Sequence, residues 1–286
     1  MPPLSGVTVA DLTRQLPGPF ASRELLRLGA RVVKIEPPEG DATPDAWYTD
    51  LNAGKELLAW DARTEPPPTV LREADVVLEG FRPGVFERLG VELAPAAILC
   101  SITGFGAGGP RAGDAGHDLN YLGYAGVLAD TAPAVPPVQV ADLAGGAQAA
   151  VIEVLAALYE RARTGSGARI VVSMTHNAHR LVAHRLAGEP VPRLLPGGVA
   201  CYRIYETADG RHLTVAALEP KFWRNLCALL ERPDLEERAL DPDRPELAEL
   251  FRSRTLDAWR SLLEGRDTCV GPVLTLDEAA AELARA

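Results

Sequence analysis

His117 is one of five histidines in a chain of 286 residues, and its setting makes it a candidate for proton transfer. It lies between a glycine-rich segment, SITGFGAGGP at 101–110, and a stretch, DLNYLGYAGVL, that becomes apolar and aromatic. An imidazole exchanges a proton near neutral pH, so it can serve as an acid or a base. On position alone, a partly exposed histidine near a helix start is an equally good interpretation.

Two acidic residues stand where helices are expected to begin. Asp142 opens the apolar segment 142–165, at an N-cap position where a side-chain oxygen accepts a backbone N–H. Glu219 directly precedes Pro220, a residue typical of the first helical turn. Position favours capping for Asp142 and a helix start for Glu219, although capping and catalysis are compatible roles for Asp142.

The remaining histidines and the cysteines form no pattern that predicts a metal site. His176, His179 and His184 are three and five residues apart, and no acidic residue nearby completes a ligand set. We interpret them as helix-surface or linker residues. The cysteines show no C-x-x-C spacing, and we interpret all four as buried, reduced thiols: Cys100, Cys201, Cys227 and Cys269.

Composition restricts the classes of partner. The net charge of −10 argues against nucleic acid, and an anionic ligand would need a local cluster of cations. No apolar run approaches the ~20 residues of a membrane span. The N-terminus, MPPLSGVTVADLT, lacks the basic and apolar regions of a secretory signal. We expect a cytoplasmic protein that binds neither nucleic acid nor a membrane.

Short apolar segments bounded by glycine, proline or charge predict strands in the first part of the chain. A helix is expected between the first two, ending at Gly29, and a second over 142–165, ending at Gly165. This alternation predicts an α/β domain with a parallel sheet covered on both faces. The expected strands are 6–12, 31–36, 56–60, 75–80, 97–104 and 168–174.

The pattern changes after about residue 185, and we place a domain boundary near 185–198. The larger domain is predicted over 1–190 and the smaller over 191–286. In the smaller domain, 201–218 is predicted as a hairpin around ADG at 208–210. Amphipathic helices are expected near 220–231, 245–252, 255–264 and 275–285.

The turn after the first strand does not favour a dinucleotide site. It reads TRQLPGPFAS and lacks G-x-G-x-x-G, while Pro17 and Pro19 remove backbone N–H donors that a pyrophosphate would need. The sequence also has neither a phosphate-binding G-x-x-x-x-G-K-[ST] loop nor a G-x-S-x-G elbow.

Nine segments, taken in order, cover most of the chain: LSGVTVADLTRQLPGPFAS, LGARVVKIEPPEGD, LNAGKELLAWD, ADVVLEGFRPGVFERLGV, SITGFGAGGP, GHDLNYLGYAGVL, VADLAGGAQAAVIEVLAALYER, TVAALEPKFWRNL and DTCVGPVLTLDEA. Together they resemble the class III CoA-transferase family, and GHDLNY and ALEPKFW resemble its α-methylacyl-CoA racemase branch. The resemblance implies a large Rossmann-like parallel-sheet domain that binds CoA, a smaller α+β domain and an intertwined dimer.

The resemblance implies that the chain racemises 2-methyl-branched acyl-CoA thioesters, with His117 and Asp142 as the acid/base pair and Glu219 as the partner of His117. One group removes the proton next to the thioester and the other returns it from the opposite face. Backbone N–H groups at the helix start after Asp142, where Gly145 and Gly146 allow close approach, are expected to stabilise the enolate.

The same resemblance assigns CoA contacts to Lys34 and Arg82, with Lys55 as a further candidate. A solvated surface lysine is the simpler interpretation of Lys55. Leu16, Tyr121 and Leu122 are expected to line the acyl groove.

In the family, two chains interlock and share each active site, and members continue beyond the last predicted helix with a segment that returns to the large domain. This chain stops at Ala286, and we expect a homodimer that brings Glu219 beside the partner's His117. CoA would enter as part of the substrate, with no metal or redox cofactor. Two alternatives remain: a CoA transferase that uses Asp142 as a nucleophile, and a homologue that binds acyl-CoA without turnover.

Overall fold

The computed structural model describes residues 1–188, 191, 193–242 and 245–285, which form two compact units. The first unit is Met1–His184 and the second is Arg185–Ala286. Each unit has its own hydrophobic core and its own sheet. The two are described separately below.

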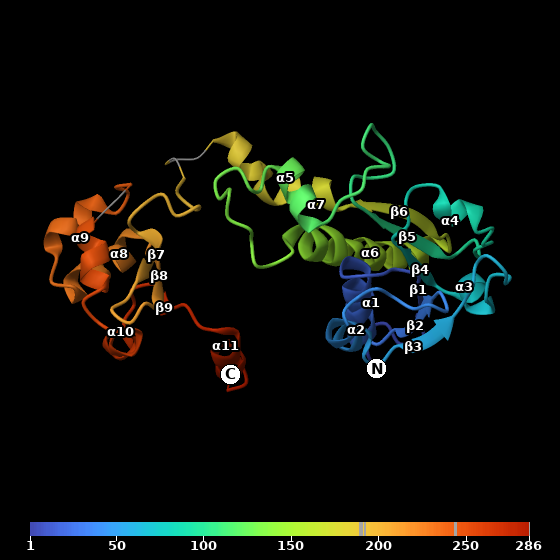
Figure 1. The fold of residues 1–286 in the computed structure, drawn as a ribbon, viewed down its shortest axis with the longest axis horizontal. Coiled ribbons are helices and arrows are strands. Elements are labelled where there is room, and N and C mark those ends of the chain that lie inside the picture. The colour runs from blue at the N-terminus through green and yellow to red at the C-terminus, as the bar shows by residue number, and fades with distance from the viewer. Residues whose placement is uncertain (189–190, 192, 243–244, 286) are drawn as a thin grey trace. The chain divides into compact units, whose positions relative to one another are not determined.

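The first unit is built on a six-stranded sheet in which every neighbouring pair of strands is parallel (Figure 1). The strand order is β3-β2-β1-β4-β5-β6, so the chain runs outward in one direction from β1 and then in the other from β4. This confirms the predicted α/β fold with a parallel sheet. The strands are β1 (Thr8–Asp11), β2 (Arg31–Glu36), β3 (Glu56–Ala59), β4 (Val76–Glu79), β5 (Ile98–Thr103) and β6 (Ala168–Ser173).

Helices cover both faces of this sheet. One core cluster joins alternate strand residues such as Val9 and Ile98 to helices α1, α5, α6 and α7, and the other joins Ala10 and Leu99 to α3 and α4. The elements are α1 (Pro17–Arg27), α2 (Asp45–Asn52), α3 (Thr69–Glu73), α4 (Val85–Arg88), α5 (Asp118–Ala125), η1 (Ala141–Gln148), α6 (Ala149–Thr164), α7 (Met174–Val182) and η2 (Ala183–Ala187).

The longest helix begins one residue earlier than predicted and is not α-helical throughout. Its first eight residues, η1, form a π-helix that continues directly into α6. The helix ends at Gly165, where φ is +75° and the missing side chain permits the left-handed turn, as predicted.

By length and mean hydropathy alone, this 24-residue helix, Ala141–Thr164, is the one described helix that would suit a membrane span. A core helix of a water-exposed domain has the same composition. Here Ala147, Ala150 and Val154 are fully buried in the core cluster that includes β5 and β6. The helix therefore has a packing role inside the first unit.

The second unit contains the predicted hairpin, with β7 (Tyr202–Glu206) and β8 (His212–Ala216) antiparallel. A third strand that was not predicted, β9 (Val270–Pro272), pairs with β8. The helices that pack around Trp223, Phe251 and Trp259 are α8 (Pro220–Leu229), η3 (Pro233–Arg238), α9 (Pro245–Phe251) and α10 (Leu256–Leu263). The last helix, α11 (Leu276–Leu283), has no buried residue.

The prediction that all four cysteines are buried is wrong for one of them. Cys100, Cys201 and Cys227 are buried, but Cys269 is exposed, in the turn immediately before β9. All four are free thiols in the described part of the chain.

Candidate active site

A cavity of ≈ 760 Å³ lies where β1, β4 and β5 end. In a sheet of this order, β1 and β4 are the neighbours at which the winding reverses, so the loops after them diverge and leave a crevice. The wall is made by the end of β5, the loops after these three strands, the starts of α1 and α5 and one residue of α7: Leu12, Thr13, Arg14, Gln15, Pro17, Gly18, Gly80, Phe81, Arg82, Pro83, Ile102, Thr103, Gly104, Ala112, Asp114, Ala115, Gly116, His117, Asn120, Tyr121 and Met174.

The loop after β1 is held by the buried carboxylate of Asp11. Its Oδ1 accepts the Thr13 N–H at 2.9 Å, and its Oδ2 accepts the Ser22 hydroxyl at 2.5 Å and faces Lys55 Nζ at 3.3 Å. Burial raises the pKa of Asp11, but the Lys55 and Lys34 ammonium groups outweigh burial and keep that pKa below its ordinary value. An ionised carboxylate therefore fixes one wall of the cavity.

The two lysines expected to contact CoA are both internal. The Lys34 ammonium group donates to the Thr13 carbonyl and lies 3.6 Å from Asp41. Lys55 Nζ donates to Asn52 Oδ1 at 2.8 Å and to the Pro19 carbonyl at 3.0 Å. Burial lowers the pKa of Lys55 to about 8, although Asp11 opposes that shift. Their side chains support the loop after β1, and a contact with CoA stays a prediction.

Lys55 is thus not the solvated surface lysine that its sequence position suggested. Asn52 is a local partner, but Asp11 and the Pro19 carbonyl come from a distant segment, which the local sequence does not reveal.

The loop after β4 is fixed in a similar way. Glu79 is buried at the end of the strand, and its Oε2 accepts the Phe81 N–H at 2.6 Å. Burial raises the pKa of Glu79, against the hydrogen bonds from Ser101 and Phe81. The next residue, Arg82, is exposed and lines the cavity, where its guanidinium is available to an anion.

His117 is the N-cap residue of α5, and it is exposed on the wall of the cavity. The Asn120 side chain fixes its backbone, because Asn120 Oδ1 accepts the His117 N–H at 3.1 Å. The Asn120 N–H in turn donates to the His117 carbonyl at 2.8 Å. The imidazole is therefore carried by a well-defined helix start.

Asp142 lies in the first turn of η1, against α5. Its N–H donates to Asp118 Oδ1 at 2.9 Å, and Asp118 is the residue that follows His117. Burial, and secondarily the charge of Asp118, raise the pKa of Asp142 to about 7. Asp142 does not line the cavity, but Tyr121 does. Burial is the main cause that raises the pKa of Tyr121, and the charge of Asp142 is the second cause.

Two expectations about this helix start are wrong. Asp142 is not the N-cap, since the helix begins at Ala141 and an acceptor for its N–H comes instead from Asp118. Gly145 and Gly146 do not face the cavity: a Cβ at Gly145 would lie 2.7 Å from the Met174 carbonyl oxygen. These glycines permit close packing of η1 on α7 and α1, so they are not placed to admit an enolate.

The apolar residues expected in the acyl groove have different surroundings. Tyr121 lines the cavity, and its hydroxyl donates to the Gly116 carbonyl. Leu16 is the half-buried N-cap residue of α1, between two lining residues. Leu122 is fully buried in the core and does not line the cavity.

Three polar residues at this site were not identified from the sequence: Arg14, Asp118 and Asn120. Arg14 is exposed and adds a second cation to the wall that carries Arg82. The only sequence signal for Asp118 and Asn120 was their place directly after His117, in GHDLNY.

Glu219 belongs to the second unit, where it is the exposed N-cap residue of α8 and its side chain makes no capping hydrogen bond. Burial is the main cause that raises the pKa of Cys269, and the charge of Glu219 is the second cause. Its expected pairing with His117 stays a prediction.

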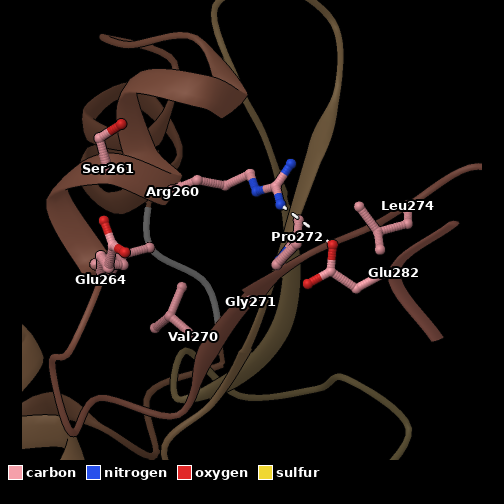
Figure 2. A pocket seen from close by; sticks show the side chains of 9 residues that line it. Arg260, Ser261, Glu264, Val270, Gly271, Pro272, Leu274 and Glu282 are labelled. Carbon is pink, nitrogen blue, oxygen red and sulfur yellow. Dashed lines mark ion pairs between the residues drawn. The ribbon is translucent and has the colours of Figure 1, made fainter. Parts of the chain in front are cut away.

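A separate cavity of ≈ 580 Å³ lies within the second unit, between α10, β9 and α11. Figure 2 shows Arg260 and Glu282 pointing toward each other across it, at 3.8 Å. It contains none of the predicted site residues. Among the described residues, no group of three or more side chains could hold a metal ion, and His176, His179 and His184 are exposed.

Comparison with known proteins gives a consistent result. A model of CoA-transferase family III matches residues 4–285. Human α-methylacyl-CoA racemase is 34% identical over 304 residues, which cover 96% of this chain and 78% of that protein. Human succinyl-CoA:glutarate CoA-transferase is 29% identical over 324 residues, covering 98% and 74%. A CAIB/BAIF family protein from Brucella suis superposes with a TM-score of 0.81 at 29% identity, covering 98% of this chain and 86% of that one.

Proposed function

Because the chain belongs to CoA-transferase family III, we propose that it is an enzyme that racemises 2-methyl-branched acyl-CoA thioesters at the carbon next to the carbonyl. Family membership implies an acyl-CoA substrate. The finer choice of reaction rests on the residues of the first unit and on the similarity to racemases, since transferases are similar as well.

The observation that carries the proposal is that the start of α5 links two different proton-transfer groups, the imidazole of His117 and the carboxyl of Asp142. His117 is exposed at the cavity, and the neighbouring Asp118 binds the N–H of Asp142. The pKa of Asp142 is raised to about 7, so its carboxyl can hold or release a proton near neutral pH. An acid and a base poised in this way suit a reaction that removes and returns a proton.

In the proposed reaction, one group takes the proton from the carbon and the C–H electron pair moves into an enolate on the thioester oxygen. The other group then returns a proton to the opposite face of that carbon. After one turnover the first group holds the proton and the second has lost one. The enzyme regains its starting protonation by exchanging these protons with solvent, or by a turnover of the other epimer, in which the two groups exchange roles. The N-terminal end of α5 borders the cavity and is positioned to stabilise the negative enolate oxygen.

We further propose that Arg14 and Arg82 bind the phosphates of CoA, because both are exposed cations on the cavity wall. Glu219 of a second copy of the chain would orient His117 and stabilise its imidazolium form. This arrangement requires a homodimer with a composite active site. CoA is part of the substrate, and the chemistry needs no metal or redox cofactor.

The transferase alternative uses the same Asp142. Its carboxylate would attack the thioester carbonyl and expel CoA as a thiolate, giving a mixed anhydride that CoA later reopens. The similarity to a succinyl-CoA:glutarate CoA-transferase supports this alternative. A raised pKa opposes it, since a nucleophilic carboxylate must be ionised and a protonated one does not attack.

The test is incubation with one epimer of a 2-methylacyl-CoA in D₂O, with and without an added free carboxylate. Deuterium entering at the α-carbon together with loss of chirality is the expected result. Transfer of CoA to the added carboxylate, without α-exchange, would establish the transferase instead. Binding with neither outcome would identify a non-catalytic acyl-CoA-binding protein.

A further inference from the structure

Asp118 has no assigned role, yet its carboxylate binds the backbone N–H of Asp142, the residue that carries the proposed catalytic carboxyl. Its Oδ1 lies 2.9 Å from the Asp142 nitrogen and accepts that N–H. The N–H of Ala141 also acts on the Asp118 carboxyl as a hydrogen-bond donor. Asp118 is the first residue of α5, and its side chain therefore links α5 to the first turn of η1. The N–H groups of that turn have no partner within their own helix.

This contact brings the Asp118 carboxylate against the backbone of Asp142 in a partly buried setting, where the charge of Asp118 acts on the Asp142 carboxyl. A negative charge beside a buried carboxyl disfavours ionisation of that carboxyl, because both the low dielectric and the like charge oppose a second negative charge. Burial also raises the pKa of Asp118, but the N–H groups of Asp142 and Ala141 oppose that rise. No such hydrogen bonds lower the pKa of Asp142, so Asp142 is the member of the pair that retains the proton.

Other charged groups near η1 do not offset the charge of Asp118. On α5, Tyr121 uses its hydroxyl on Gly116. On α1, Arg23 pairs with Asp50 of α2, and Glu24 pairs with Arg27 of the same helix.

On α7, His176 Nδ1 lies 2.7 Å from Ser173 Oγ, and His179 Nδ1 lies 3.0 Å from the Ala125 carbonyl. None of the other titratable groups on elements packed against η1 is among the causes of the pKa shifts of Asp142 and Asp118. These groups are Tyr124 on α5, Arg180 on α7, Glu153, Tyr159, Glu160, Arg161 and Arg163 on α6, Arg169 on β6 and Cys100 on β5. Within the described ranges, no cation lies within ion-pair distance of Asp142, so Asp118 is its dominant charged neighbour.

We propose that Asp118 is a positioning residue for Asp142: its carboxylate anchors the first turn of η1 against α5, and its negative charge there disfavours ionisation of the Asp142 carboxyl. The inference rests on the proposed function, in which Asp142 exchanges a proton with the substrate. Asp118 acts through Asp142 and contacts no reacting atom in this scheme. His117 would then be the group that accepts the first proton.

The test measures the pKa of Asp142 without substrate, by ¹³C NMR of protein labelled at the aspartate carboxyl carbons, with the Asp142→Asn variant to assign the signal. In Asp118→Asn, an oxygen that can accept the Asp142 N–H remains but the charge is gone. We expect the pKa of Asp142 to fall by roughly one unit, because a like charge next to it has been removed. An unchanged or higher pKa would overturn the proposal.

Glu160→Gln is the matched control, since Glu160 is an exposed carboxylate farther along the same continuous helix, paired with Arg163 at 3.5 Å. It should leave the pKa of Asp142 unchanged. If Asp118→Asn does not fold, the wild-type protein still decides the question. The Asp118 signal should then show an inflection at the Asp142 midpoint that disappears in Asp142→Asn, and its absence in the wild type would contradict the coupling.

The pH profile of racemisation separates this inference from the proposed function. A fall in the pKa of Asp142 should move the corresponding limb of the kcat/KM profile by the same amount in Asp118→Asn. A merely structural role would lower the rate without moving that limb. If the NMR shift occurs in a protein that does not racemise the substrate, the proposed reaction fails and the role of Asp118 stands.

Discussion

Asp11 and Glu79 end two adjacent parallel strands, and each folds back to accept a backbone N–H two residues further along the chain. The distances are 2.9 Å from Asp11 Oδ1 to the Thr13 nitrogen and 2.6 Å from Glu79 Oε2 to the Phe81 nitrogen. In the β1–β4 register Asp11 pairs with Leu78, so the two carboxyls lie at the same end of the sheet. Together they fix the loops that form two walls of the cavity.

Replacing Asp11 with alanine should strongly destabilise the first unit. The change removes the carboxylate that pairs with the buried Lys55 Nζ at 3.3 Å, and an uncompensated buried charge typically costs about 3–5 kcal/mol. Urea unfolding followed by circular dichroism measures the loss. Glu56→Gln breaks the exposed pair with Arg31 and should have little effect. Equal losses in the two variants would show that Asp11 does not have this role.

The pH dependence of stability should differ between the wild type and Asp142→Asn. Asp142 has a pKa raised to about 7 in the folded chain, against 3.8 as the ordinary value. Between those values the folded state binds more protons, so the free energy of unfolding falls as pH rises from about 4 to about 7. Asparagine cannot ionise and lacks this loss.

We therefore expect Asp142→Asn to gain on the order of 2–4 kcal/mol relative to the wild type between pH 4 and pH 8. Guanidinium unfolding at several pH values in this range is the measurement. Parallel stability curves for the two proteins would mean that the Asp142 carboxyl titrates as it does in the unfolded chain.

His117→Ala and Asp142→Asn should each lower the rate of racemisation by roughly 10²- to 10⁴-fold or more, the range for loss of a general acid or base. CoA affinity, measured by calorimetry, should change little in either variant. A large loss of CoA affinity in both would place them in the binding site instead. Arg82→Ala is the contrasting variant, since it should weaken CoA binding.

Mixing two inactive variants tests the composite site. If His117 of one subunit works with Glu219 of the other, a heterodimer of His117→Ala and Glu219→Ala contains one intact site and one doubly altered site. Random exchange of subunits in an equal mixture should restore roughly a quarter of wild-type activity. No recovery, with subunit exchange verified by native mass spectrometry, would show that both residues act within one chain.

Gly145→Ala should be destabilising, because its Cβ would lie 2.7 Å from the Met174 carbonyl oxygen and backbone atoms would have to shift. Overpacking of this kind costs about 1–3 kcal/mol. Gly123→Ala, in the interior of α5, has nothing within 4 Å of the added Cβ and should be neutral or slightly stabilising. Thermal unfolding of the two variants gives the comparison.

The sheet was accessible to prediction because its signals are local. Each strand is a short apolar run bounded by glycine, proline or charged residues, and the hairpin at 202–216 has a turn of the expected composition. Strand β9 was missed because it has three residues, includes Pro272 and is defined by its pairing with β8. Helices α3 and α4 have five and four residues, too few to show a helical period.

The candidate site was accessible only in part, because its decisive contacts join distant segments. The sequence marks His117 and Asp142 separately, but nothing local indicates that Asp118 would replace Asp142 as the source of a capping acceptor. Likewise, the family resemblance assigned a CoA contact to Lys34, with Lys55 as a further candidate. Their burial against Asp41 and Asp11 depends on how β2 and the segment before β3 assemble around β1.

The π-helical geometry of η1 makes this segment unusually sensitive to a deletion. Loss of one residue, such as Ala144, would favour an ordinary α-helix continuous with α6, because the wider turns of a π-helix accommodate additional chain. With α6 anchored by its core contacts, every side chain before the deletion would rotate by roughly 100° about the helix axis. Asp142 would then turn away from α5 while the sheet remained intact. A one-residue deletion in η1 is therefore expected to leave the protein folded but to remove the Asp142 carboxyl from its place beside α5.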